Sequence, residues 1–215
     1  MAAPAGARSG RRAALQAFKR AQIREAARAV FAEHGLDGAT MRAIAARAGY
    51  TAGAIYHHYD GKEEIYGELL AESLAALQQQ VRDGAATAGP PPARAAAAAR
   101  AFFDYYRAHP DELYLGLYLY RGAAPRGLTP TLDRQLNGRL IQLLGLIAER
   151  LAAATDAPPT EANRRTVDLA AHMVGLLLME ATGRLKVLGF DAAALLDDCL
   201  QELLGGSETR PYQRS

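Results

Sequence analysis

The feature that most constrains the fold is the run of residues 40–62, which reads TMRAIAARAGYTAGAIYHHYDGK. Thr40 can start a helix, because its hydroxyl accepts hydrogen bonds from unpaired amides of the first turn and apolar residues follow at helical spacing. Gly49 ends this helix, since glycine readily takes the positive φ of a sharp turn. Thr51 then caps a second short helix, so the segment predicts two helices joined by a tight turn. The stripe expected to be buried on the second helix is Ala54, Ile55 and Tyr59.

A third helix is expected directly after this pair. Asp60 can close the second helix and cap the next one, and Glu63 follows at the capping-box spacing, with Asp in place of Ser or Thr. The apolar residues that continue the pattern are Ile65, Leu69 and Leu77. We therefore expect a helix over about residues 61–82, which completes a helix-turn-helix unit.

Basic and acidic residues are segregated along the chain. Residues 1–62 hold ten Lys and Arg against four Asp and Glu, whereas the whole chain has a net charge of only +2, so the remainder is acidic. A cationic first third is typical of a protein that binds a polyanion. A glycine turn between two helices is equally consistent with a plain three-helix core, so the charge pattern is what favours DNA. Small residues for entering a major groove are Thr51, Ala52 and Gly53, and possible phosphate donors are Tyr56, His57 and Lys62.

Three stretches within about residues 18–78 resemble the TetR/AcrR family of bacterial transcriptional regulators. They read IREAARAVFAEHGLDGAT, MRAIAARAGYTAGAIYHHY and GKEEIYGELL. Two positions depart from the family pattern, which often has Val or Ile in place of Tyr50 and Phe in place of Tyr59. The resemblance implies an all-α fold, with an N-terminal three-helix helix-turn-helix domain joined to a larger C-terminal helical domain for ligand binding and dimerisation.

The resemblance also implies roles for individual residues. Arg42 and residues 52–54 match positions that contact base edges, although Ala52 and Gly53 offer little hydrogen-bonding capacity. Phosphate contacts are implied at Thr40, Tyr56, His58 and Lys62. The full predicted DNA-binding set is Thr40, Arg42, Thr51, Ala52, Gly53, Ala54, Tyr56, His57, His58 and Lys62.

The rest of the chain is rich in periodic alanine and leucine, which predicts helices throughout. The expected divisions are a disordered basic tail at 1–17, a DNA-binding domain at 18–78, a ligand-binding and dimerisation domain at 79–205 and a polar tail at 206–215. Later helices are expected at about 93–108, 131–154, 160–187 and 192–204. A single cysteine suits a reducing cytosol, and the sequence shows neither a secretory signal nor a run apolar enough for a bilayer. These features predict a cytoplasmic protein.

Aromatic residues gather in one part of the second domain, where seven of the chain's fifteen fall within residues 102–120. Aromatics at helical spacing usually fill a core, but convergent tyrosine hydroxyls can also line an amphipathic pocket. Residues of the long helix at 160–187 could close such a pocket. The predicted ligand-binding set is Phe102, Tyr105, Tyr106, His109, Tyr114, Tyr118, His172, Met173, Leu176 and Met179.

The last two long helices are apolar over more than one face, which is typical of helices that form an interface. In the TetR/AcrR family these helices commonly build a four-helix dimer bundle, and small residues here would let them approach closely. A fully buried helix of a monomer is the alternative. The predicted dimer set is Ala171, Val174, Gly175, Leu177, Leu178, Ala181, Leu196, Cys199, Leu200 and Leu203.

Together these patterns predict a homodimeric, ligand-responsive repressor that binds double-stranded operator DNA and is released by a small apolar or aromatic effector. No cofactor, metal or membrane partner is expected. A helical small-molecule-binding enzyme is a weaker alternative, because His57 and His58 point about 100° apart on a helix and the acidic neighbours of Cys199 would raise its pKa. An effector-independent architectural DNA-binding protein also stays open.

Overall fold

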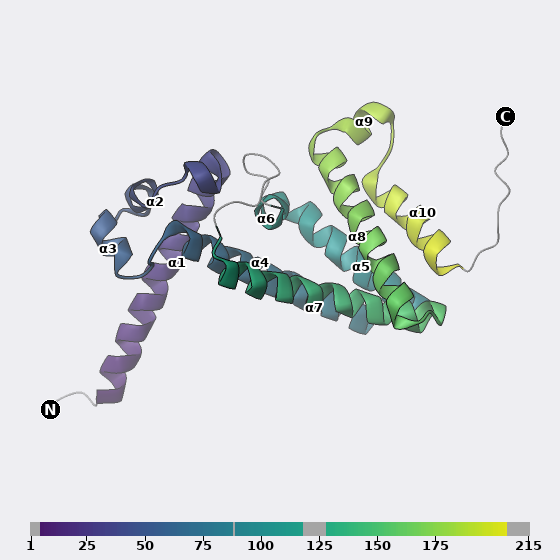
Figure 1. Ribbon diagram of the computed structural model, residues 1–215, viewed down its shortest axis with the longest axis horizontal. Coiled ribbons are helices and arrows are strands. Elements are labelled where there is room, and N and C mark those ends of the chain that lie inside the picture. The colour runs from purple at the N-terminus through teal and green to yellow at the C-terminus, as the bar shows by residue number, and fades with distance from the viewer. Residues whose placement is uncertain (1–4, 88, 118–127, 206–215) are drawn as a thin grey trace. The chain divides into compact units, whose positions relative to one another are not determined.

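The computed structural model describes residues 5–87, 89–117 and 128–205, and in these ranges every regular element is helical (Figure 1). The helices are α1 (Ala5–Gly38), α2 (Met41–Ala48), α3 (Ala52–Tyr56), α4 (Lys62–Thr87), α5 (Pro91–Ala108), α6 (Pro110–Gly116), α7 (Pro130–Thr155), α8 (Pro159–Ala181), α9 (Arg184–Leu188) and α10 (Ala192–Leu204). The all-α prediction is therefore confirmed. Among these described helices, none is long and apolar enough to cross a membrane.

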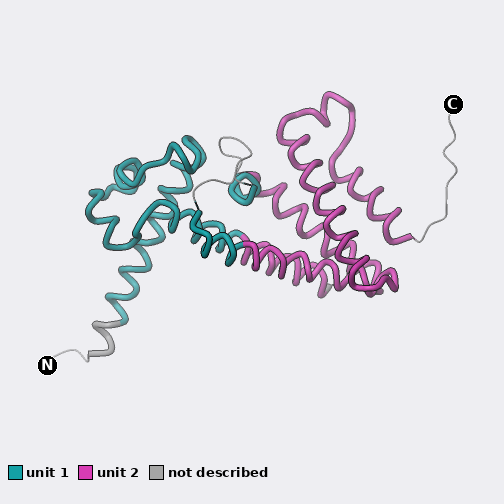
Figure 2. The backbone as a smooth tube through the Cα atoms, in the orientation of Figure 1, with its two compact units in different colours: residues 1–73, 111–136 teal, residues 74–110, 137–215 magenta. Residues whose placement is uncertain are grey.

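The chain forms two compact units, and the long helices α4 and α7 each contribute to both (Figure 2). Unit 1 comprises residues 1–73 and 111–136, and unit 2 comprises residues 74–110 and 137–215. The sequence placed residues 111–136 in the second domain, but α6 and the start of α7 pack in unit 1. The apolar pattern within a segment cannot predict that residues 111–136 pack in unit 1, because this packing depends on contacts between residues distant in sequence.

Two polar contacts fasten α6 within unit 1. Arg28 of α1 pairs with Glu112, and the Tyr66 hydroxyl of α4 donates to the Leu115 carbonyl at 2.6 Å. Leu113 and Leu115 are buried beside these contacts. The core of unit 1 also takes apolar residues from α1, α2, α3 and α4, among them Ile23, Ala27, Phe31, Ile44, Ile55, Ile65 and Leu69.

Unit 2 is a helical bundle in which α5, α8 and α10 contact one another. Small residues let α4 and α5 approach closely, since a Cβ added at Gly84 would lie 2.9 Å from the Cβ of Ala101. This explains the alanine-rich character of α5, whose buried face includes Ala95, Ala98 and Ala99. The larger core residues of the unit include Phe103, Leu143, Ile147, Leu151, Met173, Leu196 and Leu200.

The structure differs from the sequence prediction at two places. Residues 5–17 continue α1 as a helix instead of belonging to a disordered tail, because Ala, Arg, Leu and Gln favour helix even where nothing covers them. The single helix expected over 160–187 is broken after Ala181, and Gly183, at φ 71°, starts the separate helix α9. By contrast, Asp191 caps α10 as predicted, accepting from the amides of Ala193 and Ala194.

Candidate nucleic-acid interface

Helix α2 has the ends that the sequence predicts. The Thr40 hydroxyl oxygen accepts from the Ala43 amide at 3.1 Å, and Gly49 ends the helix at φ 74°. Met41 and Ile44 face the core, whereas Arg42 is exposed. The helix therefore packs on α1 through one face and leaves Arg42 on the other.

Helix α3 is short and presents small residues at its start. Thr51 caps it by accepting from the Ala54 amide at 3.2 Å, and Ile55 anchors it with a fully buried side chain. A Cβ added at Gly53 would meet nothing within 4 Å, so this surface is open. Among the predicted DNA-binding residues on and beside α3, the exposed ones are Thr51, Gly53, Tyr56 and His57. The half-buried ones are Ala52, Ala54 and His58. An open helix start with donors beside it is the geometry that a major groove accepts.

Lys62 has a structural role that the sequence did not reveal. Its ammonium donates to the carbonyl oxygens of Asp37 and Ala39, at 3.1 and 3.0 Å. Carbonyls at the C-terminal end of a helix lack intrahelical partners, so Lys62 satisfies the end of α1. An ammonium has three donors, and the third leaves Lys62 able to contact a phosphate as well.

The start of α4 differs from the expected capping box between Asp60 and Glu63. Glu64, not Glu63, reaches back to accept from the Asp60 amide, at 2.7 Å. The helix begins at Lys62, one residue later than the predicted Gly61. The same Glu64 carboxylate lies 3.8 Å from Arg20 of α1, so it also connects the start of α4 to α1.

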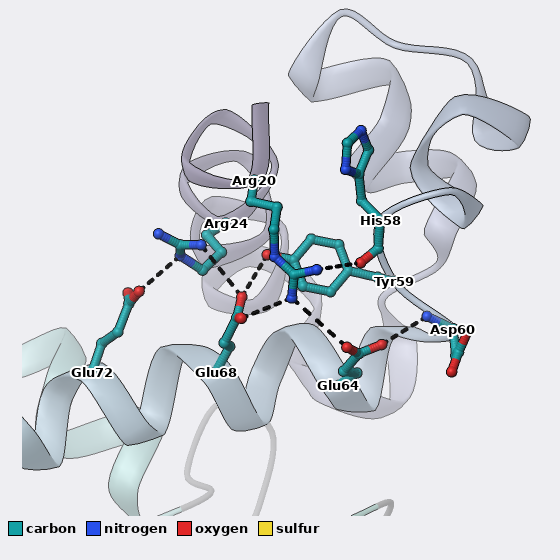
Figure 3. Close-up of polar contacts among 8 residues, drawn as sticks. All are labelled: Arg20, Arg24, His58, Tyr59, Asp60, Glu64, Glu68 and Glu72. Atoms are coloured by element: carbon teal, nitrogen blue, oxygen red, sulfur yellow. Dashed lines mark hydrogen bonds and ion pairs between the residues drawn. The ribbon is translucent and has the colours of Figure 1, made fainter. Parts of the chain in front are cut away.

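A polar cluster of Arg20, Arg24, Tyr59 and Glu68 joins α1, the end of the helix-turn-helix and α4 (Figure 3). Glu68 accepts on both carboxylate oxygens, from Arg20 at 2.8 Å and from the Tyr59 hydroxyl at 2.6 Å. Arg24 lies 3.3 Å from the same carboxylate. We call these four residues the α1–α4 clamp.

The sequence reading missed the α1–α4 clamp, although it contains a signal. Arg20, Arg24 and Arg28 recur every four residues on α1, and Glu64, Glu68 and Glu72 do so on α4. Residues four apart share a helix face, so these are two stripes of opposite charge. The missing information was that these two stripes meet in the fold, which a one-dimensional pattern does not give.

Electrostatics within the clamp agree with this geometry. Burial, and then the hydrogen bond to Glu68, raises the pKa of Tyr59 to about 12. Burial would raise the pKa of Glu68, but the hydrogen bonds from Tyr59 and Arg20 outweigh it and leave that pKa below its ordinary value. Glu68 is therefore ionised at neutral pH and Tyr59 is a neutral donor.

His58 lies in a cationic environment. Burial, followed by the charges of Lys19 and Arg20, lowers the pKa of its imidazole. The side chain is half-buried, and its backbone carbonyl accepts from Arg20 at 2.6 Å. Without DNA, this environment therefore favours the neutral form of the imidazole, which can still donate one N–H.

The residues predicted to bind a ligand are brought together only in part. Phe102, Tyr105 and Tyr106 are buried on α5, with ring centroids 5.1 Å apart for Phe102–Tyr106 and 5.4 Å for Tyr105–Tyr106. Met173 and Leu176 are buried on α8, which contacts α5. We call these five residues, which are buried on two contacting helices, the α5–α8 layer.

Among the other predicted ligand residues, His109 is exposed, but its ring centroid lies 5.0 Å from that of Tyr105. His172 is exposed, Met179 is half-buried, and Tyr114 is half-buried in unit 1. Tyr118 lies outside the described residues. An open groove of about 790 Å³ does exist in unit 2, and α4 and α5 line it with polar residues and small apolar ones, including Gln79, Asp83, Ala97, Arg100 and Ala101. None of the predicted ligand residues that the structure describes is among those lining this groove.

The residues predicted at a dimer interface fall into two groups. Leu177, Leu196 and Leu200 are buried inside unit 2, where α8 and α10 contact each other. The other seven residues are exposed or half-buried. They are Ala171, Val174, Gly175, Leu178, Ala181, Cys199 and Leu203. Burial, followed by Glu202, raises the pKa of the Cys199 thiol, so the cause is not the Asp pair that the sequence suggested. No group of His, Cys, Asp or Glu in the described ranges could hold a metal ion.

Comparison with known proteins gives relatives over different parts of the chain. The HTH-type transcriptional repressor AcnR of Corynebacterium diphtheriae is 39% identical over 66 residues, which are 31% of this chain and 35% of AcnR. The chain thus matches about a third of the length of that relative.

Solved structures match over a greater length. The transcriptional regulator FadR of Bacillus subtilis, in complex with stearoyl-CoA, is 19% identical. The match covers 87% of this chain and 98% of FadR, with a TM-score of 0.66. AibR, in complex with isovaleryl coenzyme A and operator DNA, is 18% identical, covers 86% and 98%, and has a TM-score of 0.68. At these identities the similarity establishes the fold.

Family models match both parts of the chain. Residues 23–69 match the model of bacterial regulatory proteins of the tetR family, which includes α2, α3 and the start of α4. Residues 95–203 match the C-terminal domain of tetracyclin repressor-like proteins, and this second match alone spans half of the chain. The helical architecture and the capped α2–α3 pair agree with both matches, and this chain belongs to the TetR family of bacterial regulatory proteins.

Proposed function

We propose that this protein is a transcriptional repressor that binds operator DNA as a homodimer and is released by a small-molecule effector. The observation that carries the proposal is the α2–α3 pair, in which Gly53 leaves the start of α3 open while Tyr56 and His57 stand exposed beside it. A small helix start flanked by donors fits a major groove bordered by phosphates. A repressor of this kind would act in the cytoplasm.

The roles of the DNA-binding residues follow from their placement. Arg42 is exposed and reads a base edge, since guanidinium can donate two hydrogen bonds to guanine. Thr40 and Thr51 use their oxygens as helix caps, which leaves each hydroxyl hydrogen free to be donated to a phosphate. Tyr56, His57 and the third donor of Lys62 supply contacts that are independent of sequence.

The effector is proposed to have a large apolar part. The α5–α8 layer is the part of unit 2 that holds five of the predicted ligand residues, and its side chains are aromatic and aliphatic. FadR and AibR carry acyl-CoA thioesters, so acyl-CoA is the first class to examine here, with free aromatic compounds as the second. A ligand releases DNA only if it binds the two states of the repressor with different affinity.

Dimerisation is proposed through the parts of α8 and α10 that keep surface. Ala171 and Gly175 are exposed and small, and Leu178 is half-buried on the same helix. Residues three and four apart share one helix face, so these positions form a single stripe. Two recognition helices in a dimer would need a spacing of about 34–36 Å to read successive major grooves.

The test begins with selection of bound fragments from random duplexes by the purified protein, followed by affinity measurement on the selected operator and on random DNA. We expect tighter binding to the operator and weakening by one class of ligand in a panel of acyl-CoA thioesters and aromatic compounds. Binding that no ligand in the panel alters would support an architectural protein instead. Equal affinity for every duplex would refute the repressor.

A further inference from the structure

Arg20 contacts three different parts of unit 1 through one guanidinium group (Figure 3). One nitrogen donates to the His58 carbonyl at 2.6 Å and another to Glu68 at 2.8 Å. The guanidinium carbon lies 4.1 Å from the centroid of the Tyr59 ring, within the range of a cation–π contact. Arg20 therefore joins α1, the backbone that follows α3, and α4.

The end of α3 needs such a contact. The helix has only five residues, and helices this short are not stable without tertiary contacts. Carbonyls near a helix end also lack intrahelical partners, and that of His58 is satisfied by Arg20 instead. Ile55 anchors α3 by burial and Tyr59 anchors the segment after it, and the bond from Arg20 holds the backbone between these two side chains.

Arg24 provides a natural comparison, because it lies one turn further along α1. It contacts the same Glu68 carboxylate at 3.3 Å and Glu72 at 3.0 Å. Within the described ranges its partners are the carboxylates of α4 and the Tyr59 side chain, whereas the His58 backbone carbonyl is held by Arg20. The two arginines thus share the link between α1 and α4, and Arg20 adds the link to α3.

We propose that Arg20 is a positioning residue for DNA recognition, which fixes the orientation of α3 by holding the His58 carbonyl. The inference rests on the proposed DNA-binding function and adds a residue that does not itself touch DNA. A planar guanidinium can bridge a carbonyl and a carboxylate while lying over a ring. The single ammonium of lysine keeps the charge but lacks this fork.

Hydrogen exchange in the absence of DNA tests the mechanical part of the proposal. Arg20→Lys and Arg24→Lys both keep the net charge, and Arg24→Lys is the matched control. We expect amides of residues 57–61 to exchange about tenfold faster in Arg20→Lys than in the wild type, and to be unchanged in Arg24→Lys. Equal protection in all three proteins would overturn the proposal.

Operator binding tests the functional part. We expect Arg20→Lys to weaken binding to the selected operator by about tenfold, with Arg24→Lys close to the wild type and melting temperatures of the two variants within a few degrees. The slope of log K against log salt should stay that of the wild type, because a lost phosphate contact would reduce it by about 0.9. A reduced slope would mean that Arg20 contacts DNA directly and would overturn the positioning role.

The failures of the two proposals are distinguishable. If the wild type binds no duplex, the proposed function fails, while hydrogen exchange still decides whether Arg20 holds the segment after α3. If the wild type binds its operator and Arg20→Lys binds equally well, the repressor proposal stands and the positioning role is wrong. A stability loss in Arg20→Lys that matches its affinity loss would also overturn it, because the effect would then be on folding alone.

Discussion

The Tyr59 hydroxyl donates to Glu68 across 2.6 Å and thereby joins the residue that ends the helix-turn-helix to helix α4. A phenylalanine at this position could fill the same buried space but could not make this bond. Because the acceptor is a carboxylate that two arginines also contact, the bond is charge-assisted. The hydroxyl at this position thus fixes the direction of the carboxylate that Arg20 and Arg24 share.

Tyr59→Phe should lower the free energy of unfolding by about 1–3 kcal/mol, since a hydrogen bond to a charged group is lost in a buried site. Urea denaturation measures this directly. Tyr50→Phe is the control, because the Tyr50 hydroxyl donates at a similar distance, 2.7 Å, but to the neutral Gln22 on an exposed surface. Tyr50→Phe should lower the free energy of unfolding by about 0.5 kcal/mol or less. Equal losses for the two variants would contradict a special role for the α1–α4 clamp.

Acid should remove the contribution of Glu68 to stability. Its pKa is lowered in the folded state, so the contribution is present above the unfolded pKa of about 4.5 and is lost as pH falls through the lower folded value. The difference in melting temperature between the wild type and Glu68→Gln should therefore be largest near pH 7 and shrink below about pH 4. Glu25→Gln, at an exposed position of α1, gives the baseline. A difference that stays constant with pH would show that the charge of Glu68 is not what stabilises the clamp.

Much of this site can be read from the sequence because its determinants are local. Thr40, Gly49 and Thr51 set the helix ends through hydrogen bonds and a positive φ that involve neighbouring residues only. The same holds for Asp191 at the start of α10. Where a capping side chain bonds to an amide within a few residues, the sequence pattern alone predicts the helix end.

The parts that the sequence did not reveal depend on which segments meet. Lys62 reaches back 25 residues to the Asp37 carbonyl, and Arg20 reaches 38 residues forward to His58. The apolar pattern of α8 likewise gave no means to distinguish Leu177, which is buried, from Leu178, which stays partly exposed. Such distinctions require the packing of helices that are distant in sequence.

Lys62 and Arg42 should have different effects on DNA binding. Lys62→Gln should weaken binding to operator and random DNA alike, reduce the salt slope by about 1, and cost about 1–2 kcal/mol of stability through the exposed end of α1. Arg42→Ala should cost about 1–3 kcal/mol on the operator and much less on random DNA, because only a base contact distinguishes sequences. Fluorescence anisotropy on both duplexes at several salt concentrations separates these outcomes. An equal loss on both duplexes for Arg42→Ala would remove its role in sequence reading.

Charge placed at neighbouring positions of α8 should separate assembly from folding. Leu178→Glu puts a carboxylate on the half-buried stripe and should dissociate the dimer, because an unpaired ion in an apolar interface costs several kcal/mol. Leu177→Glu puts the same charge inside the protomer, where the side chain is 4% exposed, and should unfold unit 2 instead. Light scattering and circular dichroism report the two effects. If native protein is already a monomer at micromolar concentration, the proposed interface is wrong.

The effector site is tested by one substitution inside the α5–α8 layer and one outside it. Phe102→Leu keeps an apolar side chain in a position that is 4% exposed, so it should preserve the fold and operator affinity at a cost of about 1–2 kcal/mol in stability. It also reshapes the layer beside Tyr106, whose ring packs edge-on against Phe102 at 5.1 Å. The effector concentration for half-release should therefore rise about tenfold or more, since misfitted apolar contacts cost about 1–3 kcal/mol.

His172→Ala changes an exposed position of α8 and should leave release unchanged. The reverse result, with release altered by His172→Ala and not by Phe102→Leu, would move the effector to the outer surface of α8.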